Sequence, residues 1–326
     1  HNSLGQVKVS IHKAVNQSPS YTGQKLTETV YIEVSAKVEA SKVTKRRVST
    51  SGMLKKLSVS RTGYHAFLKR KTSPSRQRKE EIKKQIRKIY DASRQNYGAP
   101  KITKELKKLG YVIAQRTFGK YMKEMGIKAQ WIKPWTTTTR DSDFSKKLHN
   151  VLDEQFNPDR PNAVWCTDIT YIWTQNGFVY LNCVMDLYAR KIIAWTLADT
   201  MEVSTVITTI NKAKTTRSTA LPLIIHTDRG SQYVSEAWRE ATQKMQRSYS
   251  HSGYPYDNAC IESFHALIKR EWLNRFSIRD YHHAYRLVFE YIEAFYNTVR
   301  IHSHCDYMSP AEFEKLYEKV TKLPAA

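Results

Sequence analysis

Three runs of strand-forming residues follow one another directly within residues 163–199, and they predict an antiparallel meander. Asn176 and Gly177 separate the first two runs, and this pair favours a tight hairpin turn. Helical and strand patterns then alternate as far as residue 276, in the order helix, strand, helix, strand, helix. This order predicts a mixed α/β sheet of the ribonuclease-H type.

Two of the predicted strands carry an aspartate where an apolar residue would be expected. Asp168 interrupts the first strand, and Asp228 ends the fourth strand, which begins at Pro222. A buried, ionised aspartate without a partner costs several kcal/mol, so it must be paired, protonated or holding a cation. The first and fourth strands are neighbours in a sheet of this type. We therefore expect the two carboxylates to lie close together.

A third acid, Glu262, lies on the long helix predicted from Asn258. Asp257 or Asn258 is expected to cap this helix. Glu262 falls outside the predicted apolar stripe and shares another face with His265, Ala266 and Lys269. The apolar stripe consists of Ile261, Phe264, Ile268 and Trp272. If the helix packs across the sheet, Glu262 can face the two aspartates, and Lys269 can meet a phosphate.

Three converging carboxylates repel one another unless a hard cation neutralises them. Oxygen ligands suit Mg²⁺ or Mn²⁺, and two such ions can promote displacement at phosphorus. Any single acid is more often a helix cap or an ion-pair partner, but the set Asp168, Asp228 and Glu262 predicts a site for two Mg²⁺ ions, with Mn²⁺ as a substitute. Asp186 is a weaker candidate, expected to pair with Arg190 or to shape the sheet.

The positive charge of the chain is concentrated in one segment. Residues 41–150 contain 30 Lys and Arg against 7 Asp and Glu, whereas the net charge of the whole chain is +23. Such a density predicts binding of a polyanion, because neutralisation of phosphates dominates nucleic-acid affinity. Two helix-turn-helix patterns, at residues 48–71 and 102–127, fall within this segment. The alternative, ordinary bundled helices, is less favoured because the two patterns share one strongly basic segment.

The second helix of the later unit is expected to expose Gln115, Arg116 and Lys120 for phosphate or base contact. Arg61, Arg229 and Lys269 are also predicted to contact DNA. The predicted organisation is an unassigned segment (1–40), an all-α basic helix-turn-helix region (41–130), a linker (131–161), a catalytic core (162–276) and a C-terminal helical extension (277–326).

Several other classes of protein are disfavoured. The chain has no P-loop and no G-x-S-x-G elbow, and its four cysteines show no paired spacing. His302–Cys305 could suggest zinc, but no second ligand pair stands nearby, and His226 is expected to be structural. No apolar run approaches the roughly 18 residues of a membrane span. We therefore expect a cytoplasmic, nucleoid-associated protein that does not contact a membrane.

Four motifs in this order, "VWCTDITYI", "HTDRGSQY", "YDNACIESFHALIKRE" and "AFYNTVRIHSHCDYMSPAEFE", closely resemble bacterial insertion-sequence transposases of insertion sequence family three. The resemblance covers residues 48–317 and excludes residues 1–40. It implies a core similar to retroviral integrase. It also implies an acidic triad at Asp168, Asp228 and Glu262, with Lys269 as the basic residue after the glutamate.

The resemblance further implies binding of terminal inverted repeats, cleavage of a 3′ end by water, and transfer of the freed 3′-hydroxyl to another phosphodiester. Double-stranded DNA and further copies of the chain are the implied partners. Two alternatives remain open. The interval from Asp228 to Glu262 is shorter than usual for the family, which keeps open an inactive DNA-binding protein acting as a repressor. A ribonuclease-H-type nuclease would hydrolyse strands without joining them.

Overall fold

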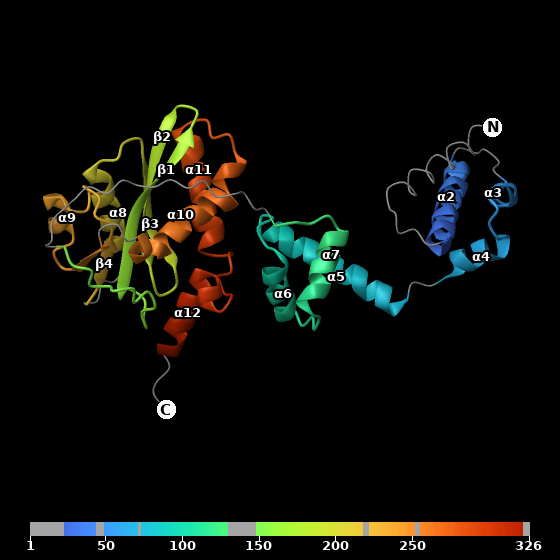
Figure 1. Ribbon diagram of the computed structural model, residues 1–326, viewed down its shortest axis with the longest axis horizontal. Helices are drawn as coiled ribbons and strands as arrows, with labels where there is room; N and C mark the ends of the chain where they lie inside the picture. Colours follow the sequence, from blue (N-terminus) through green and yellow to red (C-terminus); the bar gives the residue numbers. More distant parts are fainter. Residues whose placement is uncertain are drawn as a thin grey trace. The chain divides into compact units, whose positions relative to one another are not determined.

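The computed structural model describes residues 23–43, 49–70, 73–129, 148–217, 222–251 and 255–321. The chain divides into two compact units, His1–Glu81 and Ile82–Ala326, and each is described by itself (Figure 1). Much of the predicted linker, through residue 147, lies outside the described residues, as do residues 1–22 of the unassigned segment.

The first unit contains the helices α2 (Gly23–Val43), α3 (Thr50–Lys56) and α4 (Arg61–Lys69), and the first residues of α5. The run around Val30 is helical, and Val30 and Val34 share its buried face. Their partners across the unit include Leu54 and Tyr64. Ser60 caps α4 by accepting a hydrogen bond from the Gly63 amide at 3.2 Å.

The second unit begins within α5 (Pro74–Ala92), whose residues from Ile82 onward form a helical cluster with α6 (Ala99–Lys108) and α7 (Gln115–Glu124). Ile86, Ile102 and Phe118 are fully buried, one from each helix, and pack in one apolar cluster. Gly110 follows α6 with a φ of +85°, a conformation that an L side chain rarely adopts, and so favours the end of the helix there.

The core of the second unit contains a five-stranded sheet in the order β3-β2-β1-β4-β5. Its strands are β1 (Val164–Thr174), β2 (Gly177–Asp186), β3 (Lys191–Ala198), β4 (Ile224–Thr227) and β5 (Gln246–Tyr249). The first three strands are antiparallel, whereas β4 runs parallel to both β1 and β5. The predicted adjacency of the first and fourth strands is therefore confirmed. Because β4 pairs only with Val164–Cys166, the rest of β1 has no β4 partner.

Helices cover both faces of this sheet. On one face, α8 (Val203–Thr216) and α9 (Glu236–Ala241) pack with Trp165 and Val184. On the other, α10 (Ala259–Glu271) and α11 (Tyr281–Tyr291) pack with Cys166 and Leu181. The chain continues through a π-helical turn (Ile292–Tyr296) to α12 (Pro310–Thr321); short 3-10 turns occupy Pro255–Asn258, Leu273–Arg275 and Ser303–Cys305.

A buried ion pair fixes the C-terminal end of α10. Both guanidinium nitrogens Nε and Nη2 of Arg300 donate to the Glu271 carboxylate at 2.7 Å, and the Tyr291 hydroxyl donates to it at 2.8 Å. The adjacent Ile301 amide donates to the hydroxyl of Tyr97 at 2.7 Å. This network ties the helix that carries Glu262 to the segment after α11.

Asp186 corrects one expectation from the sequence. Its carboxylate accepts hydrogen bonds from the amides of Asn162 (2.8 Å) and Tyr188 (3.0 Å), and its nearest cation is Arg217 at 4.0 Å. Arg190 instead donates to the carbonyls of Phe156 and Leu187, so the predicted pairing with Arg190 is wrong. Asp186 holds the chain before and after the β1–β2 pair, which is the other role that the sequence suggested.

Candidate active site

Asp168 lies in the middle of β1, on the face that α10 covers. Its Oδ1 accepts a hydrogen bond from the Ile169 amide at 2.8 Å, and its Oδ2 lies 3.3 Å from Nδ1 of His265 on α10. His265 is only 6% exposed, and its Nε2 is buried with no hydrogen-bond partner among the described residues. The sequence placed His265 beside Glu262 on the helix but gave it no role. Its contact with Asp168 is tertiary and leaves no pattern in the sequence.

Asp228 follows β4 directly, at the carboxyl end of that strand. The Gly230 amide donates to its Oδ1 at 3.0 Å. A Cβ atom added to Gly230 would lie 3.1 Å from the same oxygen, which is closer than side chains normally pack. Glycine at this position therefore lets the turn bring its amide onto the aspartate. The carboxylate is thereby held at the tip of the strand.

Glu262 occupies the first turn of α10 and reaches the solvent. Partial burial, and then the negative charge of Asp168, raise the pKa of the Glu262 carboxyl. Burial lowers the pKa of Lys269, two turns further along the helix, while the charge of Asp168 opposes that shift. Asp168 thus interacts electrostatically with both Glu262 and Lys269. The geometry places the two acids and the lysine on one side of the core.

Tyr233 belongs to a buried hydrogen-bond network near the two aspartates. Its hydroxyl donates to Asn182 Oδ1 at 3.2 Å, and the Thr167 hydroxyl donates to the same oxygen at 3.1 Å. Burial, followed by the charges of Asp168 and then Asp228, raises the pKa of Tyr233 far above its usual range. Tyr233 therefore stays neutral and keeps its hydroxyl proton for this buried network. The sequence gave no signal for this network, because its members are far apart along the chain.

Within the ranges that the structure describes, no group of three or more His, Cys, Asp or Glu side chains is arranged so that it could hold a metal ion. The chemistry of the donors nevertheless suits a hard cation. Asp168 and Glu262 supply carboxylate oxygens, and burial and then the charge of Asp168 raise the pKa of Glu262; Mg²⁺ favours such ligands. Asp228 supplies a third carboxylate at the adjacent strand end.

The predicted DNA-contacting residues have different surroundings. Gln115, Arg116 and Lys120 are all exposed in the first two turns of α7, and Arg61 is exposed at the start of α4. Arg229 is directed into the protein, since its Nε donates to the Ser250 carbonyl at 2.7 Å and its Nη2 to the Leu148 carbonyl at 3.3 Å. These bonds give Arg229 a role in holding the turn after Asp228.

The remaining histidine motifs have structural partners. His226 is fully buried, and its ring nitrogens lie 2.9 Å and 3.2 Å from the hydroxyls of Ser248 and Ser250. His304 Nε2 lies 2.9 Å from the Tyr188 carbonyl, and Cys305 contacts the Ala189 carbonyl at 3.3 Å. These contacts explain both motifs by packing and hydrogen bonding.

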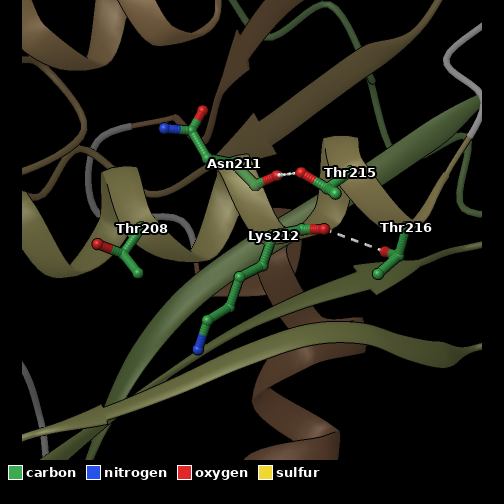
Figure 2. Close-up of a pocket in the computed structure, with 5 residues that line it drawn as sticks. All are labelled: Thr208, Asn211, Lys212, Thr215 and Thr216. Carbon is green, nitrogen blue, oxygen red and sulfur yellow. Dashed lines mark hydrogen bonds between the residues drawn. The ribbon is translucent and has the colours of Figure 1, made fainter.

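An open hollow lies along one side of α8 and is separate from the carboxylates (Figure 2). The Thr215 hydroxyl donates to the Asn211 carbonyl at 2.9 Å, and the Thr216 hydroxyl donates to the Lys212 carbonyl at 3.1 Å. These threonines bond to their own helix, and no predicted site residue lines the hollow. The lining residues are Thr208, Asn211, Lys212, Thr215 and Thr216.

Comparisons with known protein families agree with this architecture. Residues 158–254 and 243–310 match two families described as integrase core domains, and residues 77–135 match an HTH-like domain. The transposase for insertion sequence element IS904 of Lactococcus lactis is 35% identical over 246 residues, which are 74% of this chain and 97% of that protein. The chain belongs to the insertion-sequence transposases. The family resemblance carried by the four sequence motifs is confirmed, as are the integrase-type core and the N-terminal helix-turn-helix fold.

Further relatives place the transposase in insertion sequence family three. Transposase InsF of insertion sequence IS3A from Escherichia coli is 32% identical over 82% of this chain and 94% of its own. Among solved structures, the HTLV-2 integrase catalytic core in complex with magnesium matches 48% of this chain and 98% of that chain, with 14% identity and a TM-score of 0.38. The transposase relatives, the integrase core domains and the HTH-like domain show that the chain binds DNA and acts in DNA transposition, as a polynucleotidyl transferase. Across the described helices, none is long and apolar enough to cross a membrane.

Proposed function

We propose that Asp168, Asp228 and Glu262 form the reaction centre at which this transposase cuts the 3′ ends of its element and joins them to another phosphodiester. The observation that carries the proposal is the electrostatic interaction between Asp168 on β1 and Glu262 on α10. The two residues are 94 positions apart in the sequence, and the charge of Asp168 raises the pKa of Glu262. Two facing carboxylates on the surface of a DNA-binding enzyme are destabilising without a compensating charge. Perturbed acids of this kind are typical of functional sites.

Mg²⁺, or Mn²⁺ in its place, is the proposed cofactor, with two ions at each site. The three carboxylates would hold these ions, which when bound would polarise the scissile phosphodiester and favour ionisation of the attacking hydroxyl. Other residues of the chain would hold the carboxylates and the phosphate in place. His265 holds Asp168 Oδ2, the Gly230 amide holds Asp228 Oδ1, and Lys269 offers its ammonium to the phosphate.

Recognition of the DNA is proposed for the basic helical region. Gln115, Arg116 and Lys120 would meet the terminal inverted repeats, because they project together from the first turns of α7. Arg61 would add a contact from α4, and the assembled enzyme would be a homo-oligomer that holds two ends. Residues 41–130, 131–161, 162–276 and 277–326 remain the proposed DNA-binding region, linker, catalytic core and C-terminal extension.

The alternative function is that of a catalytically inactive, DNA-binding repressor. One observation favours it: across the described residues the acids do not already form a three-ligand cluster. Such a protein would bind the repeats as the transposase does but would leave the strands uncut with any divalent cation.

The decisive variants are Asp168→Asn, Asp228→Asn and Glu262→Gln, tested for cleavage and joining of a labelled terminal repeat. Each should lower the rate by at least about 100-fold, as removal of a charge-stabilising group does elsewhere, and each should leave DNA affinity unchanged. Glu236→Gln, on the exposed surface of α9, is the matched control and should keep the parent rate. Retained chemistry in any of the three variants, or loss of DNA binding in all of them, would refute the assignment.

A further inference from the structure

Three large aromatic side chains are exposed together near the turn of the β1–β2 hairpin. Tyr171, Trp173 and Phe178 are 40%, 61% and 48% exposed. Trp173 and Phe178 are directly opposite each other in the strand register, with ring centroids 4.8 Å apart, and Tyr171 packs against Phe178 at 5.3 Å. Single exposed aromatics are common on soluble proteins, but a contiguous group marks a binding surface.

This aromatic cluster lies close to the proposed reaction centre along the same strand. Tyr171 and Trp173 follow Asp168 by three and five residues, or roughly 10 and 17 Å at the rise of a strand, and this odd spacing directs them to the opposite face of β1 from Asp168. The ammonium of Lys269 lies 4.4 Å above the Tyr171 ring. Lys269 belongs to α10, on the helix face that carries Glu262, and it reaches the ring where β1 has no β4 partner. The cluster and the acids are therefore joined by one cationic side chain.

The arrangement of the rings suits nucleobases. The two ring pairs are edge-to-face, with interplanar angles of 73° and 79°, so each pair leaves at least one ring face available to a further ring. Bases stack on such faces regardless of sequence, and a nearby cation attracts the phosphates of the same strand. Lys269 supplies that cation.

We propose that Tyr171, Trp173 and Phe178 form a stacking platform for an unpaired nucleotide of the transposon end, a few nucleotides from the phosphodiester that reacts. The proposal rests on the proposed function and assigns that site a preference for locally unpaired DNA. At a rise of 3.4 Å per nucleotide, 10 to 17 Å corresponds to roughly three to five nucleotides. A second copy of the chain is a less suitable occupant, because a stable protein interface needs about 20 to 30 residues from each partner.

The test places 2-aminopurine at one position at a time in a duplex that carries the element's terminal repeat and a short unpaired end. Stacking on an aromatic ring should quench its fluorescence at a position roughly three to five nucleotides from the cleavage point. Trp173→Ala and Phe178→Ala should each restore the fluorescence and weaken binding of the unpaired end by about 5- to 150-fold. Trp173→Phe should retain both properties because it keeps a ring.

The control variant is Phe289→Ala, which removes a ring that is 49% exposed on α11, and it should behave as the parent. Binding is measured in EDTA, so failure of the catalytic assignment would leave this result intact. Unchanged quenching in Trp173→Ala and Phe178→Ala would overturn the proposal. Loss of oligomers in sedimentation, with unchanged quenching, would also overturn it and assign the surface to a contact between copies.

Discussion

Replacement of Glu271 by alanine should strongly destabilise the catalytic unit, although Glu271 is no part of the proposed reaction centre. Arg300 is 5% exposed and directs two guanidinium nitrogens to the Glu271 carboxylate at 2.7 Å. The Tyr291 hydroxyl donates a third hydrogen bond to it at 2.8 Å. Removal of the carboxylate leaves a buried guanidinium without its counter-ion, which costs about 3–5 kcal/mol.

The same pair predicts how stability changes with pH. Burial alone would raise the pKa of the Glu271 carboxyl, but the hydrogen bonds and charge of Arg300 outweigh burial and lower it below its usual value. The unfolded chain therefore takes up this proton at a higher pH than the folded chain. The stability that Glu271 contributes is present above its unfolded pKa, near 4.5, and is lost as the pH falls through the lower folded pKa.

Urea unfolding followed by tryptophan fluorescence measures the effect, since all seven tryptophans lie in the unit Ile82–Ala326. Glu236→Ala is the control, because its pair with Arg239 is exposed and is worth at most about 1 kcal/mol. Glu271→Gln keeps an acceptor for Arg300 and should fall between the control and Glu271→Ala. A loss below about 1 kcal/mol in Glu271→Ala would refute the reasoning.

Two further predictions concern DNA binding and the core. Arg116→Ala and Lys120→Ala should each weaken binding to all DNA sequences and reduce the slope of log K against log salt by about 0.9. DNA titrations at several salt concentrations measure this slope. An unchanged slope would show that the replaced residue does not contact a phosphate. Burial lowers the pKa of His226 to about 4, so protonation of this side chain favours the unfolded chain. The free energy of unfolding should therefore decline by up to about 1.4 kcal/mol per pH unit as the pH falls from 6.5 towards 4. His226→Gln should flatten that decline in pH-dependent urea unfolding, and an equal decline in the variant would assign it to other groups.

The sequence predicted the parts of the fold that depend on local pattern. Strand periodicity, the Asn176-Gly177 turn and the order of elements were enough to predict a sheet in which β1 and β4 are neighbours. The Ser60 cap and the end of α6 at Gly110 were predictable because each depends on one residue with a strong conformational preference. The contrast is α2, where Val30 and Val34 share a buried face but neighbouring valines and threonines blur the period.

Interactions between distant residues escaped prediction for a physical reason. The sequence suggested Arg190 as the partner of Asp186 because the two are close along the chain, whereas the fold brings Arg217 to within 4.0 Å. The contact of His265 with Asp168 and the pair of Glu271 with Arg300 join segments that meet only after the core has packed. Asp168 and Asp228 were singled out as candidates because a carboxylate in an apolar strand or at its tip stands out locally, and their role together with Glu262 stays a prediction.

The most direct test of the central claim is the product formed by the parent transposase from a labelled duplex that ends in its terminal repeat, in Mg²⁺, beside Asp228→Asn. We expect cleaved 3′ ends that become joined to a second strand with the parent, and bound but unreacted DNA with the variant. Cleavage without joining would identify a nuclease. Binding without strand chemistry in either Mg²⁺ or Mn²⁺ would contradict the account and identify a repressor.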